Sequence, residues 1–270
     1  MENTNTLILK NITHYYQSKN GEHIHAINDI DLSVKKGEFL AIVGSSGCGK
    51  STLLNIMCGM LKPTKGEVLI DGKPLHFGRH KIGYISQMDT LLPWRKIVDN
   101  IALGLEIRGE DKKHRIKLAK ELMQTSGLAG FEEKYPYELS GGMRKRAIIM
   151  RALAQNPDVI FMDEPFGPLD VFTRELLQDE ILNIWEKRKN TIVYITHDIS
   201  EAITLADRII LMSYRPSSIK SEYIVGLPRP RNNIESKSSS QFIELEKQIW
   251  DDIKSEVIKG RKEEMGEYGA

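Results

Sequence analysis

Nine consecutive residues have types and spacing that suit phosphate chemistry, and they read Gly44-Ser45-Ser46-Gly47-Cys48-Gly49-Lys50-Ser51-Thr52. They match G-x-x-x-x-G-K-[ST] between an apolar run at 39–43, typical of a buried strand, and a helical pattern at 53–57. The glycines let backbone N–H groups turn inward as an anion-binding nest, and the helix adds its positive dipole end. Lys50 would reach the β- and γ-phosphates, and the Ser51 hydroxyl would ligate Mg²⁺. The run therefore predicts a nucleoside triphosphate site; the alternative is a glycine-rich turn with a chance Lys-Ser.

Several apolar segments must position this loop. Weak alternation at 7–13 and 26–34 predicts a small antiparallel sheet ahead of it. Buried strands follow at 82–87, 159–164, 191–197 and 209–212, separated by helical patterns, which favours a mainly parallel sheet. Three of these strands end at polar groups, namely Gln87, Asp163-Glu164 and His197. Ligands of such sheets bind beyond the carboxyl ends of the strands, so we expect these residues to converge on the phosphates.

Two segments depart from this alternation. From about 95 to 150 the pattern is helical, which predicts a helical lobe inserted into the α/β core. Residues 229–240 carry prolines, asparagines and serines and are interpreted as a linker between a domain at 1–228 and a helical extension at 241–270. That extension has one apolar stripe, formed by Phe242, Leu245, Ile249, Ile253 and Val257. Packing on its own domain is the favoured interpretation of the stripe, and a docking or regulatory helix is the alternative.

Composition limits the classes of protein that need be considered. The 270 residues carry a formal net charge of +1, so no overall field attracts nucleic acid or an anionic membrane. The two cysteines, Cys48 and Cys58, are too few for a disulfide framework and suggest a reduced, cytosolic compartment. Residues 1–6 are polar and lack a signal-peptide core. No run reaches the roughly 18 apolar residues of a membrane span, so we expect membrane association to come through a partner.

A second group of residues could also bind an anion. Leu139-Ser140-Gly141-Gly142-Met143-Arg144-Lys145-Arg146 places a serine and two glycines at the start of a helical pattern. A simple N-cap with a glycine turn is the alternative.

With this group the sequence resembles the ABC-type ATPases, from about residue 7 to residue 228. The motifs occur in the family's order: Tyr16 for the aromatic residue that stacks on adenine, Gly44 to Thr52 for the phosphate loop, Gln87 for the Q-loop, LSGGMRKR for the signature, Val159 to Glu164 for Walker B, Pro168-Leu169-Asp170 for the D-loop and His197 for the switch histidine. The resemblance implies a P-loop NTPase (RecA-like) core with a mainly parallel sheet, an N-terminal antiparallel β subdomain and an inserted helical subdomain.

The resemblance also implies roles in ATP hydrolysis. Glu164 would polarise the attacking water as a general base, and His197 would contact the γ-phosphate. Asp163 would hold Mg²⁺ through water, with Ser51 and Gln87 completing the coordination. Tyr16 would stack on adenine, with the adjacent Tyr15 as the alternative, since neighbouring strand residues face opposite sides. The predicted catalytic residues are Lys50, Gln87, Glu164 and His197, and the predicted nucleotide contacts are Tyr16, Gly44, Ser45, Ser46, Gly47, Cys48, Gly49, Lys50, Ser51, Thr52, Ser140, Gly141, Gly142 and Asp170.

The family's architecture implies partners as well. Two copies would face each other head to tail, with Ser140, Gly141 and Gly142 of each closing the partner's γ-phosphate site. Within the family, Leu91-Leu92-Pro93-Trp94 and Asp163-Glu164-Pro165-Phe166-Gly167 resemble importer subunits for nitrate, sulfonates and taurine. Such a subunit would sit on the cytoplasmic face of the membrane, peripheral to permease subunits and indirectly served by an extracytoplasmic solute-binding protein. The alternative is an ABC-type ATPase in DNA repair or translation.

Two residues depart from the family pattern. Lys145 stands where the family usually has Gln, which would add a charge near the opposing nucleotide. Pro168 replaces the usual Ala of the D-loop and would stiffen it.

Overall fold

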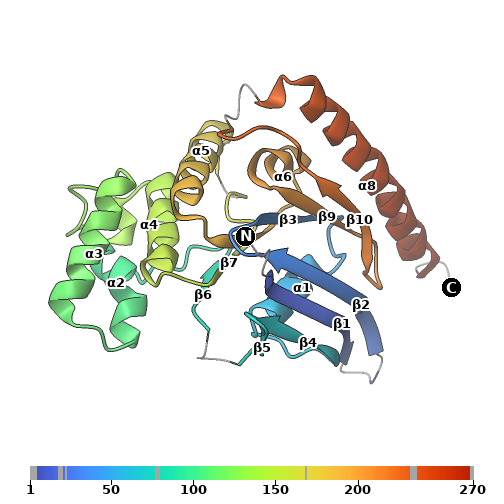
Figure 1. The fold of residues 1–270 in the computed structure, drawn as a ribbon, viewed down its shortest axis with the longest axis horizontal. Helices are drawn as coiled ribbons and strands as arrows, with labels where there is room; N and C mark the ends of the chain where they lie inside the picture. The colour runs from blue at the N-terminus through green and yellow to red at the C-terminus, as the bar shows by residue number, and fades with distance from the viewer. Residues whose placement is uncertain are drawn as a thin grey trace. The chain divides into compact units, whose positions relative to one another are not determined.

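The computed structural model describes residues 5–17, 21, 23–76, 80–167, 169–231 and 236–267, with backbone alone for 261–267. The chain divides into two compact units (Figure 1). Unit 1 comprises 1–80 and 189–270, and unit 2 comprises 81–188. No helix within the described ranges combines the length and the apolar character needed to cross a membrane.

Two sets of strands form the framework of unit 1. The first is antiparallel, in the order β2-β1-β4-β5, and its strands are β1 (Asn5–Gln17), β2 (His23–Lys35), β4 (Lys65–Ile70) and β5 (Lys73–Pro74). The second has the order β10-β9-β3-β8, and its strands are β3 (Phe39–Val43), β8 (Thr191–Ile195), β9 (Arg208–Met212) and β10 (Ile219–Ile224). β3 pairs in parallel with β8 and β9, whereas β10 is antiparallel to β9.

The core of unit 1 lies around β3. Every residue of β3, β8 and β9 is buried, which explains why these segments are apolar without alternation. Helices α1 (Lys50–Met57) and α6 (Ile199–Leu205) contact these strands. The buried strands fix where the loops at their carboxyl ends lie.

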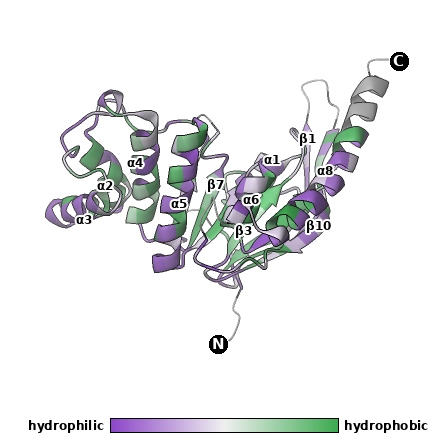
Figure 2. Ribbon diagram, turned by 90° about the horizontal axis from the view of Figure 1, so that it is seen from above, coloured by the Kyte–Doolittle hydropathy of each residue, from purple (hydrophilic) through white to green (hydrophobic). Residues whose placement is uncertain are grey.

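The C-terminal helix α8 (Ser240–Glu267) packs on its own unit, beside α6 and β10 (Figure 1). In Figure 2 one side of the helix is green and the other purple. Phe242, Ile249 and Ile253 of the predicted stripe are buried, while Leu245 and Val257 are half-buried. The favoured interpretation of the stripe is therefore confirmed. The linker boundaries stay a prediction, although Arg231 inside the predicted linker is buried and donates to the carbonyl oxygens of residues 203, 204, 206, 225 and 227.

A buried carboxylate anchors α8. Glu256 is 2% exposed and accepts from the backbone N–H of Tyr214 at 2.8 Å, from Lys220 at 3.0 Å and from Lys259 at 3.2 Å. Burial raises the pKa of Glu256, but the hydrogen bonds from Tyr214, Lys220 and Lys259 together outweigh it, so this pKa lies below its ordinary value of 4.5. The ionised form is therefore stabilised by folding.

We expect Glu256→Gln to lower the free energy of unfolding by about 1–3 kcal/mol at pH 7, because the ammonium partners lose their carboxylate. A carboxyl group with a lowered folded pKa stabilises the fold above its unfolded pKa and loses that contribution as pH falls through the folded value. The difference between wild type and variant should therefore shrink below pH 4.5 in urea unfolding. Glu244→Gln, at an exposed position of α8, is the matched control. Equal stability of Glu256→Gln and wild type at pH 7 would contradict the conclusion that Glu256 anchors α8.

Unit 2 combines a strand pair with helices. β6 (Ile82–Ile85) and β7 (Val159–Asp163) run parallel, with Ile85 opposite Met162. The helices are α2 (Ile97–Ile107), α3 (Lys112–Thr125), α4 (Gly141–Ala154) and α5 (Val171–Arg188), with a 3-10 turn at Pro136–Glu138. α2, α3 and α4 pack on one another, so helices form where the sequence predicted the lobe. The predicted strand at 82–87 ends two residues early, at Ile85.

Candidate functional site

The predicted phosphate loop joins β3 to α1 inside unit 1. Lys50 is the first residue of α1, and Ser51 and Thr52 follow in its first turn. Gly49 caps the helix at φ 103°, a left-handed conformation, and a Cβ there would lie 3.0 Å from Ile27 Cδ1. A larger residue would be strained and crowded at this position. The strand, turn and helix needed for an anion-binding nest are thus present.

The polar groups of the loop suit a phosphate. Lys50 is 7% exposed, and its Nζ donates to the carbonyl oxygens of Gly44 and Ser45, both at 2.9 Å. In the described part of the chain, the buried Ser45 Oγ has no hydrogen-bond partner. Burial raises the pKa of the Cys48 thiol, opposed by the nearby charge of Lys50. Cys48 is therefore a neutral packing residue, and its neighbours supply the polar atoms.

Tyr16, and not Tyr15, faces this loop. The Tyr16 hydroxyl lies 3.1 Å from Thr52 Oγ1, and the residue is 40% exposed. Tyr15 stacks on His25, with ring centroids 4.2 Å apart. The alternation along β1 thus directs Tyr16 toward the first turn of α1. A base could stack on its exposed ring.

We expect Tyr16→Ala to weaken ATP binding by about 1–3 kcal/mol, the usual effect of losing one base–aromatic stack. Calorimetric titration with a non-hydrolysable ATP analogue would measure this loss. Tyr15→Ala removes a ring of similar exposure that stacks elsewhere, so its affinity should stay at the wild-type value. A larger loss in Tyr15→Ala than in Tyr16→Ala would reverse the assignment.

His197 follows the carboxyl end of β8, at the edge where β3 leads into the phosphate loop. Ile195 pairs with Ile42 in the parallel register, and the Thr196 N–H donates to the Ile42 carbonyl oxygen at 3.3 Å. The His197 side chain is exposed. The phosphate loop and the turn that carries His197 therefore leave the same edge of the parallel strands in unit 1, and their convergence on the phosphates stays a prediction.

A buried carboxylate holds the turn that carries His197. Glu201 Oε2 accepts from the hydroxyls of Tyr194 and Thr196, both at 2.8 Å. Asp198 caps α6 by accepting from the Glu201 N–H at 3.1 Å. The sequence analysis did not identify this network. Its signal was the capping pattern, with an acidic residue at 198 and Glu201 three positions later.

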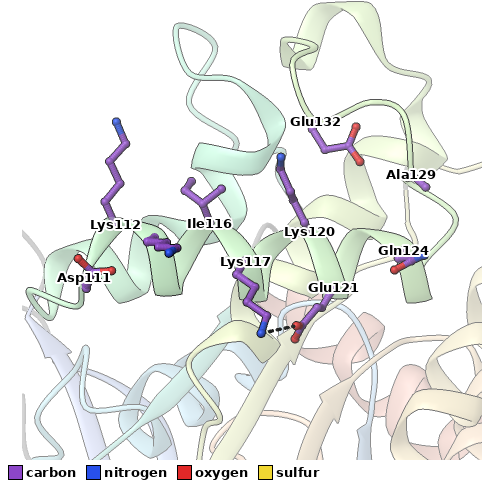
Figure 3. Close-up of a pocket in the computed structure, with 10 residues that line it drawn as sticks. Asp111, Lys112, Ile116, Lys117, Lys120, Glu121, Gln124, Ala129 and Glu132 are labelled. Atoms are coloured by element: carbon purple, nitrogen blue, oxygen red, sulfur yellow. Dashed lines mark ion pairs between the residues drawn. The ribbon is translucent and has the colours of Figure 1, made fainter.

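The cavities differ in whether predicted site residues line them. A groove of about 600 Å³ in unit 1 is lined by His197, Asp198 and residues of α6 and α8. A larger one, of about 890 Å³, lies on α3 in unit 2 and is lined by Lys112, Lys117 and Lys120 among others (Figure 3). Its lining contains both lysines and carboxylates, and Lys117 pairs with Glu121 at 3.9 Å. None of the residues that line this larger cavity was predicted to bind nucleotide.

Unit 2 brings together the other strand-end residues. Because β6 and β7 are parallel and in register, Gln87 and the pair Asp163-Glu164 leave the same edge. A Cβ on Gly167 would lie 3.2 Å from Gln87 Nε2, so the Gln87 amide reaches the turn after Glu164. Glu164 has φ 42°, an uncommon left-handed conformation for a residue with a side chain. Such strained backbone conformations concentrate at functional sites.

The signature and D-loop segments also meet within unit 2. Ser140 caps α4, its Oγ accepting from the Met143 N–H at 3.3 Å. A Cβ on Gly142 would lie 2.8 Å from Thr173 Cγ2, so only glycine permits this approach to α5. Asp170 Oδ1 accepts from the Thr173 N–H at 3.0 Å, and bonding to Thr173 lowers the pKa of Asp170. Ser140 and Asp170 thus stand at the starts of two neighbouring helices.

The predicted magnesium ligands fit the cation by their chemistry. Ser51 offers a hydroxyl oxygen, Gln87 an amide oxygen and Asp163 a carboxylate, which are the hard donors that Mg²⁺ prefers. Among the described residues, no group of three or more His, Cys, Asp and Glu could hold a metal ion.

Lys145 has contacts within its own chain that its position in the sequence did not indicate. Its side chain is buried within its own chain, and Nζ donates to the carbonyl oxygens of Ser86 at 3.2 Å and Gln87 at 3.3 Å. The ammonium group therefore lies against the segment after β6, and its effect on an opposing nucleotide stays a prediction. Pro168, the other departure, lies outside the described residues.

Sequence analysis also missed a cation beside the phosphate loop. Arg215, in the loop after β9, has a guanidinium nitrogen 3.7 Å from where a Cβ on Gly47 would stand. Its charge lowers the pKa of Cys48, although burial dominates there. No local motif marks Arg215, because more than 160 residues separate it from the loop that it approaches.

Comparison with known proteins gives consistent results. A family model described as ABC transporter matches residues 27–167. The chain is 41% identical to an aliphatic sulfonates import ATP-binding protein of Bacillus cereus, over 90% of this chain and 94% of the relative. It is 39% identical to a taurine import ATP-binding protein of Roseobacter denitrificans, over 95% and 98%. A solved ATP-binding cassette, described as dimeric, post-hydrolysis and bound to ADP and Pi, has 34% identity, a TM-score of 0.72 and coverage of 82% of this chain and 100% of that one. The fold predicted from the sequence is confirmed by this likeness.

Proposed function

Because this chain belongs to the ABC transporter family and is an ABC-type ATPase, we propose that it is the ATP-hydrolysing subunit of an importer. The solute is of the nitrate, sulfonate or taurine kind, and a separate permease carries it. The observation that carries the proposal is the similarity to a sulfonate import subunit over nearly the full length of both chains. The phosphate loop of unit 1, with Lys50 and Ser45 at its centre, provides the physical basis for nucleotide binding.

The proposed reaction is phosphoryl transfer to water, which needs placement and charge neutralisation more than covalent chemistry. Lys50 and the N–H groups of the loop bind the phosphates, and Tyr16 stacks on adenine. Glu164 accepts a proton from the attacking water, and His197 orients that water. Ser51, Asp163 and Gln87 would hold Mg²⁺, which when bound neutralises charge on the β- and γ-phosphates.

The proposed assembly is a head-to-tail dimer. Ser140, Gly141 and Gly142 of one copy contact the γ-phosphate bound by its partner, and Asp170 of the D-loop lies at the same junction. The capped N-terminus of α4 supports this, because its N–H groups are suited to an anion. ATP binding then favours the closed dimer, and hydrolysis releases it.

The proposed location is the cytoplasmic face of the membrane, in contact with permease subunits and indirectly with a solute-binding protein. An exposed aromatic residue in the segment after β6 supports a protein interface there. Trp94 is 72% exposed, whereas the nearby Leu91 is buried. Asn100 fixes this segment, since it donates to the carbonyl oxygens of Leu92 and Arg95 and accepts from the Leu92 N–H at 2.7 Å. A partner could therefore bind Trp94 without first ordering the loop. No observation favours the alternative function in DNA repair or translation.

Uptake in cells of the source organism tests the proposal. Deletion of the gene should abolish uptake of one labelled solute among nitrate, taurine and an alkanesulfonate. Wild type should restore this uptake, and Lys50→Met should not. Unchanged uptake of all three solutes would contradict the proposed solute class. If the purified wild-type protein did not hydrolyse Mg-ATP, its proposed function as the subunit that powers transport would be contradicted.

A further inference from the structure

Three basic side chains of α4 hold the segment 86–90, which follows β6 and contains Gln87. Lys145 bonds the first part of it, as described above. Arg144 Nε forms an ion pair with Asp89 Oδ2 at 2.8 Å. Arg151 NH1 donates to the carbonyl oxygen of Thr90 at 2.7 Å. We call these contacts the α4 tether; all of them lie within unit 2.

Lys145 is the buried member of the α4 tether. It is 5% exposed, and burial lowers its pKa, opposed by the charge of Asp89. Removing an ammonium group from water costs free energy, and hydrogen bonds from its N–H donors to buried acceptors offset that cost. Here they satisfy two successive carbonyl oxygens, one of which belongs to Gln87 itself.

The α4 tether joins two parts of the proposed nucleotide site, namely Gln87 and the helix that begins with the signature residues. Lys145 lies little more than one helical turn from the signature residues Ser140 to Gly142, which begin α4. The Gln87 carbonyl oxygen accepts a hydrogen bond from Lys145 of α4, and this hydrogen bond connects α4 to the Gln87 backbone. The Gln87 side-chain amide reaches the turn after Glu164.

We propose that Lys145 is a positioning residue that joins Gln87 to the signature helix, so that the two move as one piece. The inference rests on the proposed function, since it assigns Gln87 and the signature to one reaction. Lys145→Met removes the donors while keeping an unbranched side chain, and it leaves two carbonyl oxygens unpaired.

Amide hydrogen exchange of residues 86–91 measures the tether without any need for activity. We expect faster exchange there in Lys145→Met and wild-type exchange in Lys145→Arg, which keeps N–H donors. Lys120→Met is the control, because Lys120 is an exposed lysine on α3 of the same unit, outside both the signature and the α4 tether. Its exchange at 86–91 should equal that of wild type.

The kinetic expectation is a split between catalysis and binding. In Lys145→Met the kcat for ATP hydrolysis should fall about 10- to 100-fold through displacement of Gln87. KM should change less than about 2-fold, since the phosphate loop is intact, and Lys145→Arg should restore kcat. If Lys145→Met fails to fold, Lys145→Gln, one bond shorter and neutral, should loosen the same amides.

Three outcomes would overturn the inference: unchanged exchange at 86–91, faster exchange with unchanged kcat, or an equal fall of kcat in Lys120→Met. Failure of the proposed function is a different result. In that case wild type would lack ATP hydrolysis, while the exchange experiment would still report on the tether.

Discussion

Glu164→Gln is expected to lower the rate of ATP hydrolysis by about 10²- to 10⁴-fold, the range that a general base contributes. The amide keeps the size of the side chain but cannot accept the proton of the attacking water. ATP binding should persist, because the phosphate loop is unchanged. With hydrolysis blocked, ATP should hold two copies together. Light scattering with and without Mg-ATP would then detect a stable dimer of the variant and a transient one of wild type.

The outcomes of this experiment separate the roles assigned to Glu164. Dimerisation with undiminished hydrolysis would keep the assembly and require another base, with His197 as the next candidate. A monomeric variant that hydrolyses ATP at the wild-type rate would contradict both the base and the shared site. Glu121→Gln is the control, since Glu121 is an exposed carboxylate on α3 of the same unit. It should behave as wild type in both measurements.

Lys50→Met is expected to weaken ATP binding by about 10- to 100-fold, since charge-assisted hydrogen bonds contribute about 1.5–3 kcal/mol each. The loss arises because Lys50 is the buried cation at the centre of the loop, already bonded to two of its carbonyl oxygens. Thermal unfolding would report it as a smaller rise of Tm with added ATP than in wild type.

The control for this variant is Lys36→Met, at an exposed position of unit 1 in the turn before β3. Its Tm should rise with ATP as that of wild type does. An ATP-dependent rise in Lys50→Met equal to that of wild type would mean that the loop binds no phosphate through Lys50. The Tm without ATP must be compared first, because removal of the ammonium group also leaves the carbonyl oxygens of Gly44 and Ser45 unpaired.

Local patterns predicted much of the fold. Short sequence patterns marked the phosphate loop, the parallel strands around it and the helices at 97–154. These signals depend on side-chain periodicity and glycine conformation, which neighbouring residues determine. The same patterns do not fix element boundaries: β6 ends at Ile85, two residues before the predicted end at 87. Tertiary packing decides where an element ends, and periodicity alone does not.

By itself, the sequence predicted which residues bind and hydrolyse a nucleotide, because Gly44 to Thr52 and Asp163-Glu164 are each local groups whose expected chemistry follows from residue type and spacing. Only the tertiary structure decided between Tyr15 and Tyr16, turned Lys145 inward to Gln87, placed Arg215 beside Gly47 and packed α8 on unit 1. Each of these contacts joins residues far apart in the chain. The direction of a side chain there depends on which partner the fold brings near, and that information is not contained in any short stretch of sequence.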